Sequence, residues 1–311
     1  MEFPKYFDSK NSLNLYGLEK DFNFLSKLYS TKNLPKVLML SGLKGSGKST
    51  LINHFLFSIF DKKNYSKDEL KILESSILLK QFKNDIFQNI IYLKGSDFKS
   101  ITVEDIRSLK SKILQTSIDN KERFIILDDV ELFNINSLNA LLKIIEEPSK
   151  KNFFILINNK TKPLIDTIKS RCLELKIFLD EMKRIEIITK LTNFYKLDMA
   201  LDANKSKLTP GNFLKFNYIF LENKISLKGE FLDNLSLLLN LYKKHKDTVF
   251  INLIFYLADL FFKELKDKNI IKIDKFYENK AYVLDNLNKF FTFNLSQNSL
   301  INAINSKLNN D

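Results

Sequence analysis

The strongest constraint on the fold is the stretch GLKGSGKS at residues 42–49, which fits the pattern G-x-x-x-x-G-K-[ST] in full. The apolar run VLMLS at 37–41 precedes it and predicts a buried strand, and STLINHFLFSIF after it has the spacing of a helix. A glycine-rich loop between a strand and a helix gathers backbone N–H groups at a helix N-terminus, where phosphate binds. The stretch therefore predicts a phosphate-binding loop in an α/β fold.

Within this loop we expect Lys48 to bring a positive charge to the β- and γ-phosphates of a nucleotide and the Ser49 hydroxyl to bind Mg²⁺. The alternative is a glycine-rich turn that binds nothing, and the complete motif in its proper context argues against it. The expected cofactor is ATP or ADP with Mg²⁺. The predicted nucleotide-binding residues of the loop are Gly42, Gly45, Ser46, Gly47, Lys48, Ser49 and Thr50.

A second stretch with a chemical signature is FIILDDVE, an apolar run that ends in Asp128 and Asp129. A strand that ends beside the P-loop strand would place the Asp128 carboxylate near Mg²⁺. Asp129 stands where ATPases of this arrangement commonly carry a glutamate that orients the attacking water. Aspartate is one methylene shorter, and a displacement of about 1 Å can cost ~10²-fold in rate. We therefore expect the chain to bind ATP rather than to hydrolyse it. The alternative to these roles is that Asp128 and Asp129 merely cap the next helix.

The remaining pattern divides the chain into a mixed region and a helical region. Apolar runs separated by helices predict a parallel sheet covered on both faces. After about residue 180 only helical patterns follow, with soft boundaries near 180 and 225. The further predicted strands are 89–95, 123–130 and 152–159, and the predicted helices between them are 102–117 and 136–149.

Composition excludes several classes of protein. The chain has 311 residues, of which 44% are hydrophobic and 28% charged, as in an ordinary soluble globular protein. One cysteine, Cys172, and two histidines, His54 and His245, cannot build a disulfide framework or fill a tetrahedral zinc site. No apolar stretch reaches the ~18 residues of a membrane helix, so we expect a cytoplasmic protein without a membrane partner. The net charge of +12 suggests an anionic partner but leaves nucleic acid open.

Taken together, two long stretches resemble the AAA+ clamp-loader subunits of bacterial DNA polymerase III. One begins at FIILDDVE and continues through NALLKIIEEP and FFILINN to TIKSRC, and the other is the opening LYGLEKDF up to the P-loop. The resemblance is dense over residues 14–50 and 101–179 and faint in the helical C-terminal third. Among these subunits the best match is delta-prime, because of the DDVE form of the strand end and the length of the chain.

This resemblance implies an AAA+ domain at 1–180, a helical lid at 181–225 and a helical collar for oligomerisation at 226–311. It implies a five-subunit ring that uses ATP to open a sliding clamp and place it on primed DNA. The implied partners are therefore the other loader subunits, the clamp and primed DNA. This chain would be the stator, a subunit of the DNA polymerase holoenzyme whose polymerase active site lies in another subunit.

The resemblance also implies roles for single residues. Arg171 of TIKSRC would be an arginine finger that acts in the ATP site of a neighbouring subunit, while the residues alone leave a helix cap or a surface ion pair open. Cys172 would shape the loop rather than act as a nucleophile. Asn158 at the end of FFILINN would be the sensor of the γ-phosphate, with Asn159 as the alternative.

Two departures from the family pattern bear on activity. Asn212 of LTPGNFLKF stands where relatives that hydrolyse ATP carry an arginine, and Lys215 is the candidate substitute. Many delta-prime chains carry a four-cysteine zinc module, but residues 61–86 hold no cysteine, so no zinc is expected. A self-sufficient ATPase and a scaffold with a vestigial P-loop remain the alternatives, and the intact Lys48-Ser49 pair opposes the scaffold.

Overall fold

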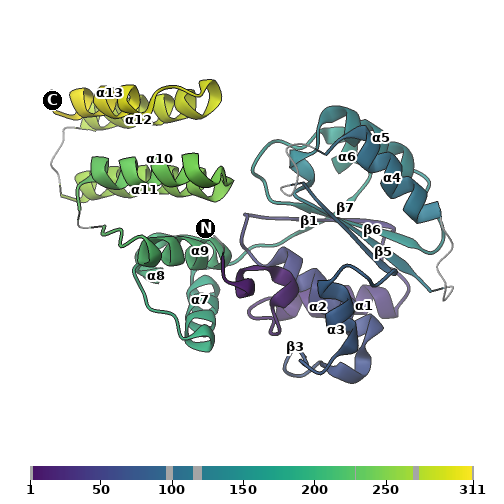
Figure 1. The fold of residues 1–311 in the computed structure, drawn as a ribbon. Coiled ribbons are helices and arrows are strands. Elements are labelled where there is room, and N and C mark those ends of the chain that lie inside the picture. The colour runs from purple at the N-terminus through teal and green to yellow at the C-terminus, as the bar shows by residue number, and fades with distance from the viewer. Residues whose placement is uncertain (1–2, 96–100, 115–120, 228, 269–272, 310–311) are drawn as a thin grey trace. The chain divides into compact units, whose positions relative to one another are not determined.

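The apolar runs pair into a parallel sheet of the order β4-β5-β6-β1-β7, which is five-stranded within the described residues (Figure 1). The predicted strands at 37–41, 89–95, 123–130 and 152–159 are confirmed. The edge strand β7 was not predicted, because LELK is short and largely exposed and so lacks a continuous apolar run. The strands are β1 Val37–Ser41, β4 Ile90–Lys94, β5 Arg123–Asp128, β6 Asn152–Asn158 and β7 Leu173–Lys176.

Helices cover both faces of this sheet, as the apolar runs predict. Successive side chains of a strand point to opposite faces, so Leu38 of β1 packs in one core and Met39 in the other. The first core is closed by α1 Glu19–Ser30, α2 Lys48–Phe60 and α3 Ile77–Lys83. The second core is closed by α4 Val103–Leu114, α5 Ile135–Ile145 and α6 Asp166–Lys169 (Figure 1).

The computed structural model describes residues 3–95, 101–114, 121–227, 229–268 and 273–309. Packing divides the chain into two compact units. The P-loop unit comprises Phe3–Leu197 and Asp202–Leu214, and the helical unit comprises Asp198–Leu201 and the chain from Lys215 onward. The domain boundaries near 180 and 225 stay predictions, and the last residues of the predicted helix 102–117 lie outside the described residues.

After β7, the elements of the described chain are all helices. No helix in these ranges is both long and apolar enough to cross a membrane. The helices are α7 Glu181–Tyr195, α8 Ala203–Ser206, α9 Pro210–Glu222, α10 Phe231–His245, α11 Thr248–Asp267, α12 Ile273–Phe293 and α13 Gln297–Asn309. The short elements are the antiparallel strands β2 Tyr65–Ser66 and β3 Lys71–Ile72 and the 3-10 helices η1 Lys5–Phe7, η2 Ser9–Asn11, η3 Lys62–Asn64 and η5 Val130–Leu132.

Candidate functional site: a P-loop beside two buried carboxylates

Three strands end together and bring the P-loop, Asp128 and Asn158 to one edge of the sheet. Ser41, the last residue of β1, pairs with Asn158 at the end of β6, and Asp128 at the end of β5 pairs with Ile157. Because the strands are parallel, the loop that follows β1 and the acids that end β5 meet at the carboxyl edge of the sheet. The P-loop and Asp128 are therefore neighbours in space, as the sequence predicted.

The backbone of the P-loop takes a path that favours glycine. Gly45 has a φ of +83° and Gly47, the residue before α2, a φ of +89°. Residues with side chains rarely adopt this region, whereas glycine enters it without steric cost. The two glycines therefore set the curvature of the loop.

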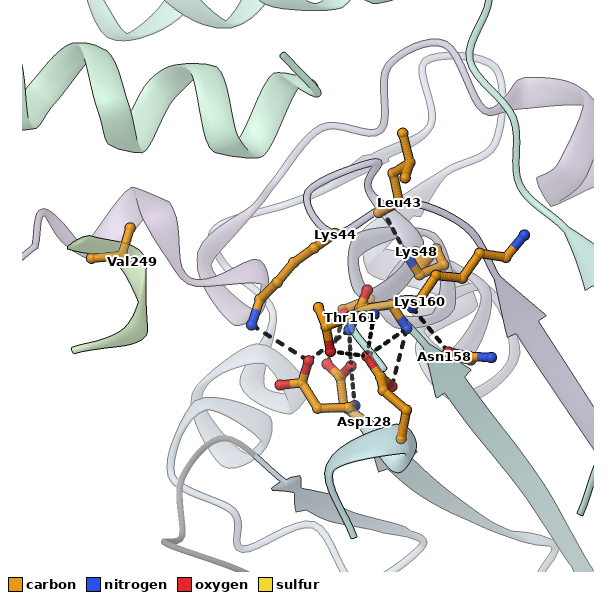
Figure 2. A network of polar contacts seen from close by, with 12 residues as sticks. Leu43, Lys44, Lys48, Asp128, Asn158, Lys160, Thr161 and Val249 are labelled. Atoms are coloured by element: carbon orange, nitrogen blue, oxygen red, sulfur yellow. Dashed lines mark hydrogen bonds and ion pairs between the residues drawn. The ribbon is translucent and has the colours of Figure 1, made fainter. Parts of the chain in front are cut away.

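Lys48 begins α2 and lies buried against the inside of this loop, with 2% of its surface exposed. Its ammonium donates to the carbonyl oxygens of Gly42 and Leu43 at 2.8 Å each and approaches Ser46 Oγ at 3.3 Å (Figure 2). Burial lowers the pKa of Lys48 to about 8, while the nearby carboxylates, chiefly that of Asp128, act in the opposite direction. The charge of Lys48 is therefore sensitive to pH just above neutrality.

The Asp128 carboxylate is the centre of the polar network at this edge. Its Oδ2 accepts hydrogen bonds from the Ser49 hydroxyl at 2.8 Å and the Tyr92 hydroxyl at 2.9 Å. Its Oδ1 accepts from the backbone N–H of Asp129 at 2.8 Å and from Asn159 Nδ2 at 3.3 Å. Oxygen atoms of hydroxyl and carboxylate groups are the ligands that Mg²⁺ prefers. The side chains of Ser49 and Asp128 therefore fit this metal. Burial and the Asp128 charge raise the pKa of Tyr92 well above its usual value.

Asp129 is buried, and the side chains of Asn159 and Lys44 lie against its carboxylate. It adopts the left-handed conformation with a φ of 53°, which is uncommon for a residue other than glycine. Its Oδ1 accepts from Asn159 Nδ2 at 2.8 Å and lies 3.5 Å from Lys44 Nζ. These contacts anchor the carboxylate within the network.

Glu131 was not singled out from the sequence, although it completes the DDVE stretch. Its carboxylate accepts the backbone N–H of Asn159 at 3.1 Å and the Thr161 hydroxyl at 2.8 Å. It therefore fixes the chain that follows β6. An acid three residues after the predicted metal ligand Asp128 was the signal available for finding it.

The two sensor candidates, Asn158 and Asn159, point in different directions. Asn158 Oδ1 accepts the backbone N–H of Lys160 at 2.9 Å, and the Asn158 carbonyl accepts the N–H of Gly42 at 3.2 Å. Asn159, the alternative, contacts both acids with its side chain. The sensor role stays a prediction for either residue.

The first turn of α9 packs directly on the outside of the P-loop, and this contact was not predicted. Thr209 Oγ1 donates to the Lys44 carbonyl at 2.6 Å, and the Gly211 N–H donates to the Gly45 carbonyl at 2.9 Å. A Cβ at Gly211 would lie 2.9 Å from Gly45 Cα, and one at Gly45 would lie 2.8 Å from the backbone nitrogen of Asn212. Asn212 is thus beside the loop.

Arg171 lies at the amino edge of the sheet, where the strands begin, between the end of α6 and the start of β7. Its Nε and Nη2 both lie 2.7 Å from Glu146 Oε1, and its Nη1 donates to the Thr167 carbonyl at 2.9 Å. The side chain of Arg171 is 38% exposed. The surface ion pair that the residues alone left open is therefore present, and the role in a neighbouring site stays a prediction.

Three further candidates complete the set. Thr50 lies in the first turn of α2, directly after Ser49. Cys172 is half-buried, and burial raises the pKa of its thiol to about 11, which disfavours the reactive thiolate. Lys215 belongs to the helical unit, so its role as a substitute for the arginine stays a prediction.

The strand order, the P-loop after β1 and the acid at the end of β5 define an AAA+-like α/β protein. The family described as DNA polymerase III, delta subunit, matches residues 17–180. The chain therefore belongs to this family of clamp-loader subunits.

Individual relatives agree with this membership. The DNA polymerase III subunit gamma of Buchnera aphidicola subsp. Acyrthosiphon pisum is 24% identical over 66% of this chain and 53% of its own length. The subunit delta′ of the same organism is 26% identical over 54% of this chain and 50% of its own length. The chain thus spans about half the length of these curated relatives.

A solved structure shows the same fold. It is a DNA polymerase III gamma-subunit-related protein of Thermotoga maritima, with a TM-score of 0.50 and 16% sequence identity, covering 92% of this chain and 99% of that chain.

The contact between the P-loop and α9 predicts an effect of Gly211→Ala. The three atoms nearest to the new Cβ would all belong to the backbone of Gly45, which cannot rotate away, so we expect a loss of about 1–3 kcal/mol in the free energy of unfolding. Urea unfolding followed by circular dichroism measures it. Asn204→Ala, at an exposed position of α8 in the same unit, is the control and should change stability by less than about 0.5 kcal/mol. Equal unfolding midpoints for the two variants would show that the contact is not tight.

Proposed function

We propose that this protein is the delta-prime subunit of a DNA polymerase III clamp loader. In this proposal it acts as the stator of a five-subunit ring that loads the sliding clamp onto primed DNA in an ATP-dependent way. The observation that carries the proposal is the family match over residues 17–180, which contains a complete P-loop facing Asp128. The neighbouring loader subunits, the clamp and primed DNA are the proposed partners.

The proposed ligand of the P-loop is ATP or ADP with Mg²⁺. The backbone of residues 42–47 and the Lys48 ammonium would hold the phosphates, with Ser46 and Thr50 beside them. Ser49 and Asp128 would hold Mg²⁺, which when bound neutralises part of the phosphate charge. Asn159 is the better-placed sensor of the γ-phosphate, since its side chain already lies on the two acids.

We propose that the chain alone hydrolyses ATP slowly or not at all. The Asp129 carboxylate, the weak candidate for orienting water, is tied to Asn159 and faces Lys44. To act on water it would have to leave both partners, and aspartate has the shorter reach. Asn212 beside Gly45 also lacks the charge that an arginine would bring to the phosphates.

The proposed action of Arg171 on a neighbouring subunit has support in the sheet topology. Leu173 pairs with Leu38, and Lys176 pairs with Ser41, the residue before the P-loop. Three strand residues, about 10 Å, therefore separate the amino edge near Arg171 from the carboxyl edge of the same sheet. Arg171 lies at the edge of the sheet opposite to the P-loop of its own chain. A phosphate that binds Arg171 would therefore belong to a nucleotide on another chain.

A self-sufficient ATPase is the second candidate function. The similarity to a gamma subunit over 66% of the chain and the intact P-loop favour it. It would require that Asp129 and either Asn212 or Lys215 perform the roles of the usual glutamate and arginine. ATP turnover by the purified chain, with and without partner subunits, separates the two candidates.

The buried Lys48 predicts nucleotide affinity that depends on pH. The polyphosphate favours the charged ammonium, whose pKa without ligand is about 8. Affinity should be full below this value and fall as the pH rises above it, by up to about tenfold per unit. Titration of fluorescent ADP on both sides of that pKa measures the effect, and Lys48→Ala should bind weakly at every pH. An affinity in Lys48→Ala equal to that of the wild type would exclude the proposed site.

The arrangement of Asp129 predicts the turnover of the isolated chain. We expect a steady-state rate far below the ~10 s⁻¹ typical of enzymes, and an increase in Asp129→Glu if carboxylate reach is limiting. A phosphate-release assay measures both rates. A wild-type rate close to the typical value would favour the self-sufficient ATPase.

The exposure of Arg171 predicts a defect that appears only in the assembled loader. Arg171→Ala should leave the melting temperature and ADP affinity of the free chain unchanged and lower the DNA-stimulated ATPase of the complex. A finger contributes ~10³–10⁵-fold at its own site, although a ring with several sites would lose less overall. Arg171→Lys should rescue poorly, because an ammonium cannot bond two oxygens in a fork.

The control for this comparison is Arg107→Ala, which removes another exposed arginine paired with a glutamate, Glu104. It should leave the ATPase of the complex intact. If Arg171→Ala also leaves the complex intact but lowers the melting temperature of the free chain, the arginine is a local structural contact only.

A further inference from the structure

Tyr92, on β4, lies beside Asp128 and Ser49, the two residues proposed to hold Mg²⁺. Its hydroxyl donates to Asp128 Oδ2 at 2.9 Å, and the same oxygen accepts the Ser49 hydroxyl at 2.8 Å. Tyr92 reaches it from the neighbouring strand, where it pairs with Ile126 two residues before Asp128. Tyr92 and the predicted Mg²⁺ ligand Ser49 thus donate to the same oxygen, Asp128 Oδ2.

The lone pairs of Asp128 are fully used. A carboxylate has about four acceptor positions on its two oxygens. Among the described residues, Oδ1 accepts two hydrogen bonds, from Asp129 N and Asn159 Nδ2, and Oδ2 accepts two, from Ser49 and Tyr92. A metal ion or one of its water molecules would need a position that one of these donors holds.

The four donors differ in whether they are compatible with a metal. Two of them bond to Oδ1, the oxygen that Ser49 does not contact. The Ser49 hydroxyl can offer a lone pair to Mg²⁺ while its proton still points at Asp128. Tyr92 donates to Oδ2 from the sheet and is the donor that competes there.

The ring of Tyr92 also has a cation beside it. Lys10 Nζ lies 5.5 Å from the centroid of its ring, and this ammonium is fixed at 2.5 Å from Asp85 Oδ1. The ring packs beside the core formed by α1, α2 and the sheet. Moving the phenol away from Asp128 would disturb these contacts.

We propose that Tyr92 competes with Mg²⁺ for Asp128, so that nucleotide binding by this chain depends only weakly on the metal. The phosphates are then held mainly by the P-loop backbone and Lys48. This inference rests on the proposed nucleotide site and adds to it the residue that sets its metal dependence.

The test compares the full chain with Tyr92→Phe, using fluorescent ADP as the probe in excess Mg²⁺ and in excess EDTA. The measured quantity is the ratio of the two dissociation constants. We expect Mg²⁺ to tighten binding about tenfold more in Tyr92→Phe than in the wild type, because one hydrogen bond to a charged group contributes on that order. Tyr29→Phe is the matched control, since it removes a similar hydrogen bond, at 2.6 Å to Glu122, near the other end of the sheet. Its ratio should equal that of the wild type.

Each outcome decides the proposal. A ratio in Tyr92→Phe within about threefold of the wild-type ratio, well short of the expected tenfold, would overturn it, while a larger increase supports it. Absence of ADP binding in both buffers, in wild type and variants, would overturn the proposed nucleotide site as well. If circular dichroism shows that Tyr92→Phe does not fold, the wild type decides. A loss of affinity in EDTA of about tenfold or more, the size of one such bond, would then contradict the proposal, and a smaller loss would support it.

Discussion

Asp128 is 4% exposed, and burying an ionised group costs several kcal/mol unless hydrogen bonds replace the lost water. Here the replacements come from the P-loop helix, from β4, from the chain after β6 and from the next backbone N–H. Each donor therefore has to stand at the carboxyl edge of the sheet. The strand order and its register meet that requirement, so satisfying one buried charge fixes the positions of the residues around it.

The two edges of the sheet are suited to different tasks. The carboxyl edge is buried and carries charged side chains, and the first turn of α9 contacts its P-loop, which suits holding a ligand in a fixed geometry. The amino edge carries Arg171 in an exposed ion pair with Glu146. Exposed pairs of this kind contribute about 0–1 kcal/mol, so the guanidinium can exchange its partner at little cost. An arginine held so weakly is available to a better anionic partner.

Much of the fold and the centre of the site were predictable, because they depend on local patterns. Continuous apolar runs identified β1, β4, β5 and β6, and the P-loop motif identified the residues that contact phosphate in the proposal. Which of Asn158 and Asn159 turns its side chain to the two acids was not predictable. It depends on the residue at which β6 ends, and the ends of elements are uncertain by one or two positions. The contact of Gly211 with Gly45 joins residues distant in sequence, and no local pattern indicates it. Tyr92 escaped notice because a tyrosine in a strand has the same signal as a core residue.

The contact of Gly45 with Gly211 also limits how this molecule can change. The sequence contains seven glycines, and four of them, Gly42, Gly45, Gly47 and Gly211, form or touch the P-loop. When a large side chain is added to an ordinary core, a smaller residue opposite can restore the fit. Here both partners already lack a side chain, so no second-site suppressor is available at the contact itself. A side chain at Gly211 can be accommodated only by moving the P-loop or the first turn of α9, because its nearest neighbours are all backbone atoms of Gly45. Either movement alters the site that this contact supports.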